Sequence, residues 1–283
     1  MPAYDPRLTP ARDDLAAKAL AGKVSAKRYV EGHVREIVEP QAPLRSEPAP
    51  DAHLSTEALR GERVTIYDEN AEGWAWGQLA DDGYVGWLPA NALAPPGAAV
   101  THKVSALRTL VFPGPSIKLS PVEALPLGAR LAIARVEGAL AVTATRGYVP
   151  AVHLAPIDVY ETDFVAVAER FLGVPYVWGG RTLAGLDCSG LIQTALEAAG
   201  IEIPRDSDQQ EAALANDVAV TADLSGLRRG DIVFWTDHVG LMLDERRLLH
   251  ANGFYGETAI EPLVTAVGRI GATGNAITSI RRI

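Results

Sequence analysis

The chain of 283 residues contains a single cysteine, in the segment "GLDCSGLIQTALEAAG" at residues 185–200. An unpaired cysteine is most often a small buried hydrophobe, so the residue type alone indicates no chemistry. Its position is more informative, because Leu191, Ile192 and Ala195 follow at helical spacing and place Cys188 in the first turn of an amphipathic helix. Unpaired N–H groups and the helix dipole favour an anion there and predict a lowered pKa for the thiol. Cys188 is therefore a candidate nucleophile.

A cysteine nucleophile needs a general base from elsewhere in the chain. His238 opens the predicted strand "HVGLML", and His250 lies in the next one, "RRLLHAN". An odd-numbered loop around residues 244–246 would place both rings on one sheet face as cross-strand neighbours, whereas an even-numbered loop would separate them. On one face, His250 would fix the tautomer of His238 and leave the other ring nitrogen for Cys188. The alternative is a pair of half-buried strand histidines.

Tyr176 of "PYVWGG" precedes the cysteine across a glycine-rich loop. Its hydroxyl, returning to the mouth of the site, would join the backbone N–H of Cys188 as an oxyanion donor. The alternative is an aromatic residue packed beside a turn. No metal is expected, because two histidines and one cysteine lack further ligand spacing, and no cofactor is indicated.

The elements that must position these residues follow from hydrophobic periodicity. Residues 164–172 and 188–199 have helical spacing, and "GDIVFW", "HVGLMLD", "RRLLHAN" and "AITSIRRI" are typical of strands. Helices followed by strands predict an α+β domain with an antiparallel sheet over residues 159–283.

Two earlier stretches, residues 59–95 and 127–156, resemble each other in "GYVGWLPANALAP" and "GYVPAVHLAP". Short alternating runs punctuated by glycine predict two small all-β barrels, at residues 39–97 and 98–158. Residues 1–38 carry a short helical pattern around Leu15, Ala16 and Leu20, and we interpret them as a helical tether that ends at a run of prolines.

Composition limits the setting. The net charge of −9 gives no electrostatic reason to approach nucleic acid or an anionic membrane. The first 40 residues contain charges every few positions and no apolar core typical of a signal peptide or a membrane span, so we expect a cytoplasmic protein. One cysteine excludes an intrachain disulfide framework and is compatible with a reducing compartment.

The segments "VPYVWGG", "LDCSGLIQ", "IPRDSDQQ", "GDIVFW", "HVGLML" and "LLHAN" together resemble the NlpC family of papain-like cysteine peptidases, which cleave γ-D-glutamyl bonds in bacterial cell-wall peptides. The two β modules resemble bacterial SH3-like domains. From about residue 40 onward the chain is thus similar to the dipeptidyl-peptidase VI type of murein peptide recycling, which acts through a thioester acyl-enzyme.

The resemblance implies that Cys188 is the nucleophile, His238 the base and His250 the orienting residue. It implies a substrate with a free N-terminal L-Ala, of the form L-Ala-γ-D-Glu-diamino acid, such as L-Ala-γ-D-Glu-diaminopimelate. Asp187 would face the substrate ammonium with Ser189 nearby. The other implied contacts are Asp206 and Ser207 beside the γ-D-Glu portion, and Tyr84 of the first SH3-like domain in the pocket wall.

The sequence differs from the resembled subtype at one position of the pocket that would bind the substrate's N-terminal ammonium. Relatives of this subtype often carry an acid where "LSTEALRGE" has Ser55, so Glu57 or Glu62 would have to compensate, or the free-amine requirement is relaxed. Three alternatives stay open at this point: a non-catalytic peptide- or wall-binding protein, an exported hydrolase of intact peptidoglycan, and an acyl transferase.

Overall fold

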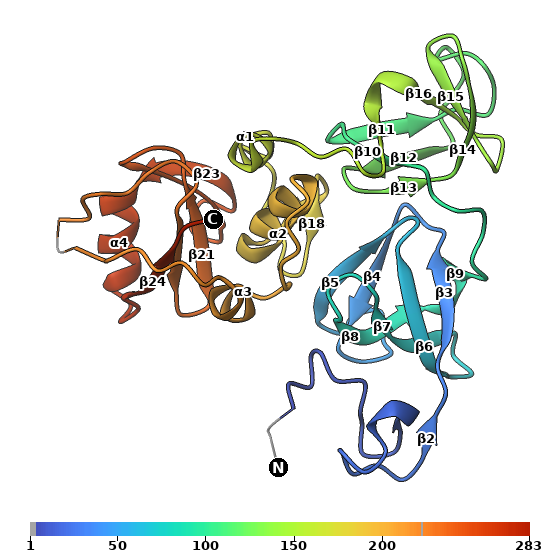
Figure 1. Cartoon of the computed structure of the whole chain (residues 1–283), viewed down its shortest axis with the longest axis horizontal. Helices are drawn as coiled ribbons and strands as arrows, with labels where there is room; N and C mark the ends of the chain where they lie inside the picture. The colour runs from blue at the N-terminus through green and yellow to red at the C-terminus, as the bar shows by residue number, and fades with distance from the viewer. Residues whose placement is uncertain (1–3, 222) are drawn as a thin grey trace. The chain divides into compact units, whose positions relative to one another are not determined.

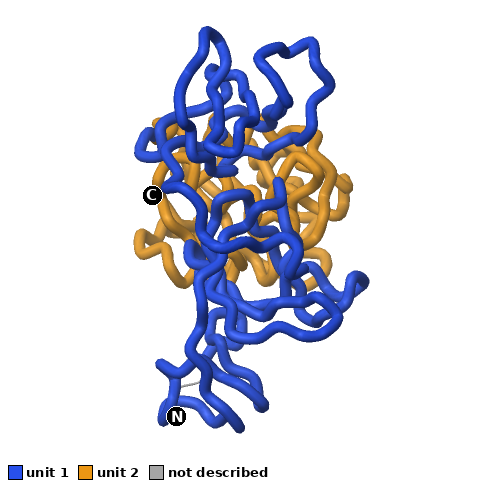
Figure 2. Tube along the Cα trace, turned by 90° about the vertical axis from the view of Figure 1, so that its right-hand side faces the viewer, with its two compact units in different colours: residues 1–159 blue, residues 160–283 orange. Residues whose placement is uncertain are grey.

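The computed structural model describes residues 4–221 and 223–283, in two compact units, Met1–Val159 and Tyr160–Ile283. Figure 2 colours the two units separately. No helix in the described part of the chain is both long and apolar enough to cross a membrane.

The first β module is one antiparallel sheet of seven strands, in the order β5-β4-β8-β7-β6-β3-β9. Alternate residues of β4 and β8 point inward, as the period of two predicts, and bury Leu44 and Leu88 completely. The strands are β3 (His33–Ile37), β4 (Gln41–Arg45), β5 (Leu54–Leu59), β6 (Arg63–Glu69), β7 (Trp74–Leu79), β8 (Val85–Pro89) and β9 (Leu93–Ala94).

The prediction of a helical tether at residues 1–38 is wrong for residues 4–38, and residues 1–3 lie outside the described residues. Residues 4–38, all of which the structure describes, contain no α-helix, and their elements are β1 (Ala16–Ala17), the 3₁₀ turn η1 (Lys18–Leu20), β2 (Tyr29–Val30) and β3. The N–H of Val85 donates to the carbonyl of Arg7 at 2.7 Å, and Leu15 is fully buried. Tertiary packing against the first module therefore overrides the weak local helical pattern.

The second β module consists of three small antiparallel sheets around one apolar cluster that includes Val104, Leu125 and Val149. A 3₁₀ turn after a proline recurs in both modules, η2 (Ala90–Ala92) and η3 (Ala151–His153), where the sequence repeat ends. The strands are β10 (His102–Val104), β11 (Arg108–Val111), β12 (Glu123–Pro126), β13 (Arg130–Leu131), β14 (Ile133–Glu137), β15 (Leu140–Thr143), β16 (Tyr148–Pro150) and β17 (Leu154–Pro156).

The second unit has the predicted α+β fold, with an antiparallel five-stranded sheet in the order β23-β22-β21-β20-β24. Figure 1 shows α2 and α4 on opposite sides of this sheet. Its elements are α1 (Phe164–Glu169), β18 (Arg181–Thr182), β19 (Gly185–Leu186), α2 (Cys188–Ala198), α3 (Ser207–Ala213), β20 (Ile232–Trp235), β21 (His238–Met242), β22 (Arg247–Asn252), β23 (Glu257–Pro262), α4 (Leu263–Gly271) and β24 (Ile277–Arg281).

Strand β23 and helix α4 were not predicted from the sequence, and both prove important for the site. Helix α4 packs Leu263 and Ala266 against one face of the sheet, in a buried cluster with Trp235, Met242 and Leu248. The even-numbered residues of β21 and β22 point to this face, and they include both histidines of the predicted site.

Candidate active site

Cys188 begins helix α2, as the sequence predicts. Asp187 is the N-cap, and its carboxylate accepts a hydrogen bond from the N–H of Gly190 at 2.7 Å. Cys188 is only 7% exposed, and the backbone N–H groups of Ser189 and Val239 interact with its sulfur. Because Val239 directly follows His238, this contact brings the sulfur to the start of strand β21.

The expectation of a lowered thiol pKa is wrong. Burial, reinforced by the Asp187 carboxylate, raises the pKa of Cys188 to about 12, and the backbone N–H groups and Arg205 only partly oppose it. The sequence pattern identified the helix start, but the burial that other elements impose on the sulfur has the larger effect. The resting side chain is therefore a neutral thiol at neutral pH.

The two histidines of β21 and β22 lie on one sheet face. The register pairs Leu241 with Leu249, which leaves an odd-numbered loop and sets Gly240 opposite His250. His238 and His250 are consequently diagonal neighbours rather than directly opposed, and His238 Nε2 lies 2.8 Å from His250 Nδ1. Of the two cases that the sequence left open, the structure has the odd-numbered loop, and the two rings form a direct hydrogen bond.

An acid that the sequence patterns did not reveal lies behind the histidine pair. His250 Nε2 lies 2.9 Å from Oε1 of Glu261 on β23, and both side chains are almost completely buried. Arg269 of α4 forms an ion pair with the same oxygen, and the hydroxyl of Tyr255 lies 3.3 Å from Oε2. The alternating run "ETAIEP" was the one sequence signal that could have pointed to this glutamate. It indicates a partner for His250 only when β23 is known to pair with β22.

Both imidazoles are neutral in the resting site. Burial is the main cause that lowers the pKa of His238 to about 3, with His250 and Arg269 adding to it and Glu261 opposing. Burial and then Arg269 lower the pKa of His250 to about 4. A neutral thiol and a neutral imidazole form the pair of groups from which a proton transfer could generate a thiolate.

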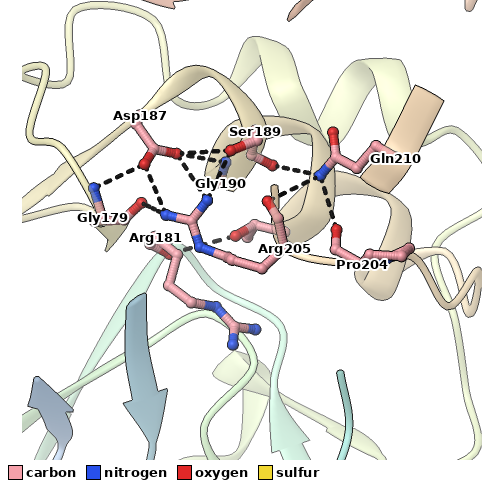
Figure 3. A network of polar contacts seen from close by, with 10 residues as sticks. Gly179, Arg181, Asp187, Ser189, Gly190, Pro204, Arg205 and Gln210 are labelled. Atoms are coloured by element: carbon pink, nitrogen blue, oxygen red, sulfur yellow. Dashed lines mark hydrogen bonds and ion pairs between the residues drawn. The ribbon is translucent and has the colours of Figure 1, made fainter. Parts of the chain in front are cut away.

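Asp187 belongs to a buried ion pair that was not predicted from the sequence. Arg205 donates from Nη1 to Oδ1 at 2.9 Å and from Nη2 to Oδ2 at 2.8 Å, and the N–H of Gly179 donates to Oδ2 at 2.7 Å (Figure 3). Arg205 is completely buried. Both carboxylate oxygens of Asp187 are thus already bonded to Arg205, and a substrate amine would have to share them with it.

Ser189 is part of the same network. Its hydroxyl accepts from Arg205 at 2.8 Å and lies 3.3 Å from Asp187, while its carbonyl accepts from Gln210 Nε2 at 3.0 Å (Figure 3). Asp206 and Ser207 are half-buried at the start of α3, directly after Arg205. The network therefore ties the first turn of α2 to the segment that carries both residues.

Tyr176 is half-buried beside the cysteine. Burial raises the pKa of its hydroxyl, and the charges of Cys188 and Asp187 add to that effect, which places the hydroxyl within electrostatic reach of the sulfur. Tyr84 lies in the other unit, buried in the core of the first β module, and its contribution to the pocket stays a prediction. The described residues contain no group of histidine, cysteine and carboxylate side chains that could hold a metal ion.

Comparisons with known proteins agree with this geometry. Residues 173–267 match the model of the NlpC/P60 family, and residues 44–93 match the SH3 domain of bacterial dipeptidyl-peptidases. The chain carries an NlpC/P60 cysteine peptidase domain. The matched segment of this domain includes Cys188, His238, His250 and Glu261.

Relatives extend the likeness beyond the NlpC/P60 domain. A γ-D-glutamyl-L-lysine dipeptidyl-peptidase from Bacillus cereus is 27% identical over 252 residues, which covers 75% of this chain and 71% of that protein. An enzyme of the same name from Bacillus subtilis is 28% identical over 227 residues, covering 71% and 73%. The crystal structure of an NlpC/P60 family protein from Bacillus cereus shares the fold, with a TM-score of 0.72 and 22% identity over 88% of this chain and 99% of that one.

Proposed function

We propose that this cysteine peptidase hydrolyses the bond between γ-D-Glu and a diamino acid in free murein peptides, such as L-Ala-γ-D-Glu-diaminopimelate, during recycling of cell-wall peptides. The observation that carries the proposal is the contact between the N–H of Val239, the residue directly after His238, and the sulfur of the one cysteine in the chain. The two Bacillus relatives named as γ-D-glutamyl-L-lysine dipeptidyl-peptidases support the bond and the diamino acid class.

The first half of the reaction forms a thioester. His238 accepts the Cys188 proton as the sulfur attacks the γ-carbonyl carbon of D-Glu, and the carbonyl oxygen becomes an oxyanion. The backbone N–H of Cys188 and the Tyr176 hydroxyl donate to that oxygen. The tetrahedral intermediate collapses as the C–N bond breaks, and His238 returns the proton to the amine of the departing diamino acid.

The second half regenerates the enzyme. His238 takes a proton from water, whose oxygen attacks the thioester carbonyl, and the C–S bond breaks to release L-Ala-γ-D-Glu. The sulfur leaves as a thiolate and recovers its proton from His238. Because burial disfavours the thiolate, it exists only briefly on either side of the acyl-enzyme.

Substrate selection rests on the residues around Asp187 in this proposal. The substrate ammonium lies beside Asp187 and Ser189, and Asp206 and Ser207 contact the γ-D-Glu portion. Arg205 neutralises Asp187, so the amine gains less from this carboxylate than it would from an unpaired one. This pairing favours a graded preference for a free amine over an absolute requirement.

Mass spectrometry of digests tests the substrate. L-Ala-γ-D-Glu-diaminopimelate, its lysine counterpart, their N-acetylated forms and intact sacculi would each be incubated with the protein and with Cys188→Ala. Release of L-Ala-γ-D-Glu from the free peptides, absent in the variant, supports the proposal. Cleavage of sacculi would favour a wall hydrolase, and no cleavage at all would favour a binding protein.

Two further readouts complete the test. Transfer of the dipeptide to an added amine in place of water would identify an acyl transferase. The cytoplasmic location is part of the same proposal, and immunodetection after fractionation of cells that produce the full chain would check it.

A further inference from the structure

A polar chain continues past the catalytic histidines toward helix α4. His250 uses both ring nitrogens, Nδ1 toward His238 at 2.8 Å and Nε2 toward Glu261 at 2.9 Å. His250 is fully buried and the Glu261 side chain is 3% exposed, so neither nitrogen is satisfied by bulk water. Each of these two hydrogen bonds must therefore have one donor and one acceptor.

The carboxylate decides which nitrogen donates. An ionised carboxylate accepts hydrogen bonds and cannot donate, so the His250 proton sits on Nε2 and leaves Nδ1 as an acceptor. His238 then donates from Nε2, and its Nδ1 carries the lone pair that accepts a proton. The negative charge of Glu261 thus selects the form of His238 that can act as a base.

We propose that Glu261 is a positioning residue that fixes the base tautomer of His238 through His250 and stabilises the imidazolium formed during catalysis, while Arg269 limits that stabilisation. The inference deepens the proposed function, on whose assignment of the base it rests. Glu261 contacts His250, Arg269 and Tyr255, and it acts on the base through the intervening His250 ring.

The two charged residues near the histidine pair have opposite effects on the pKa of His238. Glu261 of β23 favours the protonated form of His238, and Arg269 of α4 disfavours it. Arg269 is held in place on its other side, where its guanidinium lies 4.4 Å from the Phe254 ring centroid. The aromatic neighbours are uncharged: Tyr255 bonds to Glu261, and the Trp235 ring centroid lies 5.6 Å from that of His238.

Alkylation of the thiol by iodoacetamide tests the inference without a peptide substrate. The chain has one cysteine, so mass spectrometry of the alkylated protein reports Cys188 alone. The wild type would be compared over pH with Glu261→Gln, which removes the charge, and Arg269→Gln, which removes the opposing charge. The control is Glu245→Gln, the same change in the exposed hairpin turn.

The two variants should shift reactivity in opposite directions. Glu261→Gln lowers the neutral-pH alkylation rate by roughly 10-fold or more and moves the rise in rate to higher pH, because a weaker base withdraws the thiol proton less often. Arg269→Gln raises the neutral-pH rate, and Glu245→Gln leaves the profile unchanged. Equal losses in Glu261→Gln and Arg269→Gln would indicate a merely structural role and overturn the inference.

Nitrogen-15 NMR of the histidine rings supplies a second readout. In the wild type, His238 should carry its neutral-state proton on Nε2, and in Glu261→Ala a mixture with the Nδ1–H form should appear. Circular dichroism shows whether Glu261→Gln folds. If it does not, the proposal is judged by whether Arg269→Gln raises the alkylation rate and by which nitrogen of His238 carries the proton in the wild type. A wild-type His238 protonated on Nδ1 would contradict the proposal, whether or not the protein cleaves murein peptides.

Discussion

Arg205 and Asp187 form a two-pronged ion pair inside the second unit, with hydrogen bonds of 2.9 and 2.8 Å between the guanidinium and both carboxylate oxygens. Arg205 has no exposed surface. Asp187 caps the helix that begins at Cys188, so the pair holds the first turn of α2 and the cysteine with it. This contact links a residue of the predicted site to one outside it.

Replacing Arg205 with lysine should destabilise the protein. A lysine ammonium keeps the charge but cannot form two parallel bonds to one carboxylate, so the loss should be a part of the about 3–5 kcal/mol in the free energy of unfolding that removing one partner of a buried pair commonly costs. Urea unfolding would measure the loss for Arg205→Lys. The exposed Arg246→Lys is the matched control and should change stability little. A near-neutral Arg205→Lys would mean that the pair does not hold the helix start.

Replacing His238 should lower kcat more than replacing His250 does. His238→Ala removes the proton acceptor and should lower kcat by roughly 10²–10⁴-fold, with the substrate KM little changed. His250→Ala leaves the base in place but frees its tautomer, and should cost less. Steady-state kinetics on the L-Ala-γ-D-Glu peptide would check both, and a larger effect at His250 would reverse the assigned roles.

Low pH should destabilise the second unit because His238 and His250 are harder to protonate in the folded protein than in the unfolded chain. The pKa values of His238 and His250 fall to about 3 and 4 in the folded protein, below the ordinary value of about 6.5 that applies to the unfolded chain. The unfolded state therefore binds more protons between about pH 6.5 and pH 3–4, and stability falls as pH drops through that window.

Urea titrations at pH 7 and pH 5 would measure this dependence. Carboxylates also make the free energy of unfolding depend on pH in this range. The wild type is therefore compared with the double variant His238→Gln and His250→Gln. The loss of stability between the two pH values should be smaller in the double variant. An unchanged difference would show that the two rings are protonated as easily in the folded protein as in the unfolded chain.

Gly240 should tolerate no side chain. It lies opposite His250, and an added Cβ would come within 2.8 Å of Leu248 Cδ1 and 3.2 Å of His250 Cβ. Gly240→Ala should therefore cost about 1–3 kcal/mol in the free energy of unfolding and lower activity by displacing His250. In Gly268→Ala, on helix α4, the new methyl group meets no atom within 4 Å, so stability should hold or rise.

Local patterns along the chain determine much of the site. Helical spacing places Cys188 at the start of α2, and alternation places both histidines on strands. The parity of one short loop then places the rings on the same face. These features depend on residues close in sequence, whose periodicity follows directly from backbone geometry.

Only the tertiary structure decided which distant groups the site residues contact. The partner of Asp187 lies 18 residues away and that of His250 lies 11 residues away, on elements whose packing no local pattern specifies. The direction in which the pKa of the Cys188 thiol shifts also depends on the tertiary structure, since burial by other elements outweighs the local effect of a helix start. The N-terminal segment differs from its local pattern for the same reason, since Leu15 is fully buried and the carbonyl of Arg7 accepts a hydrogen bond from Val85, far along the chain.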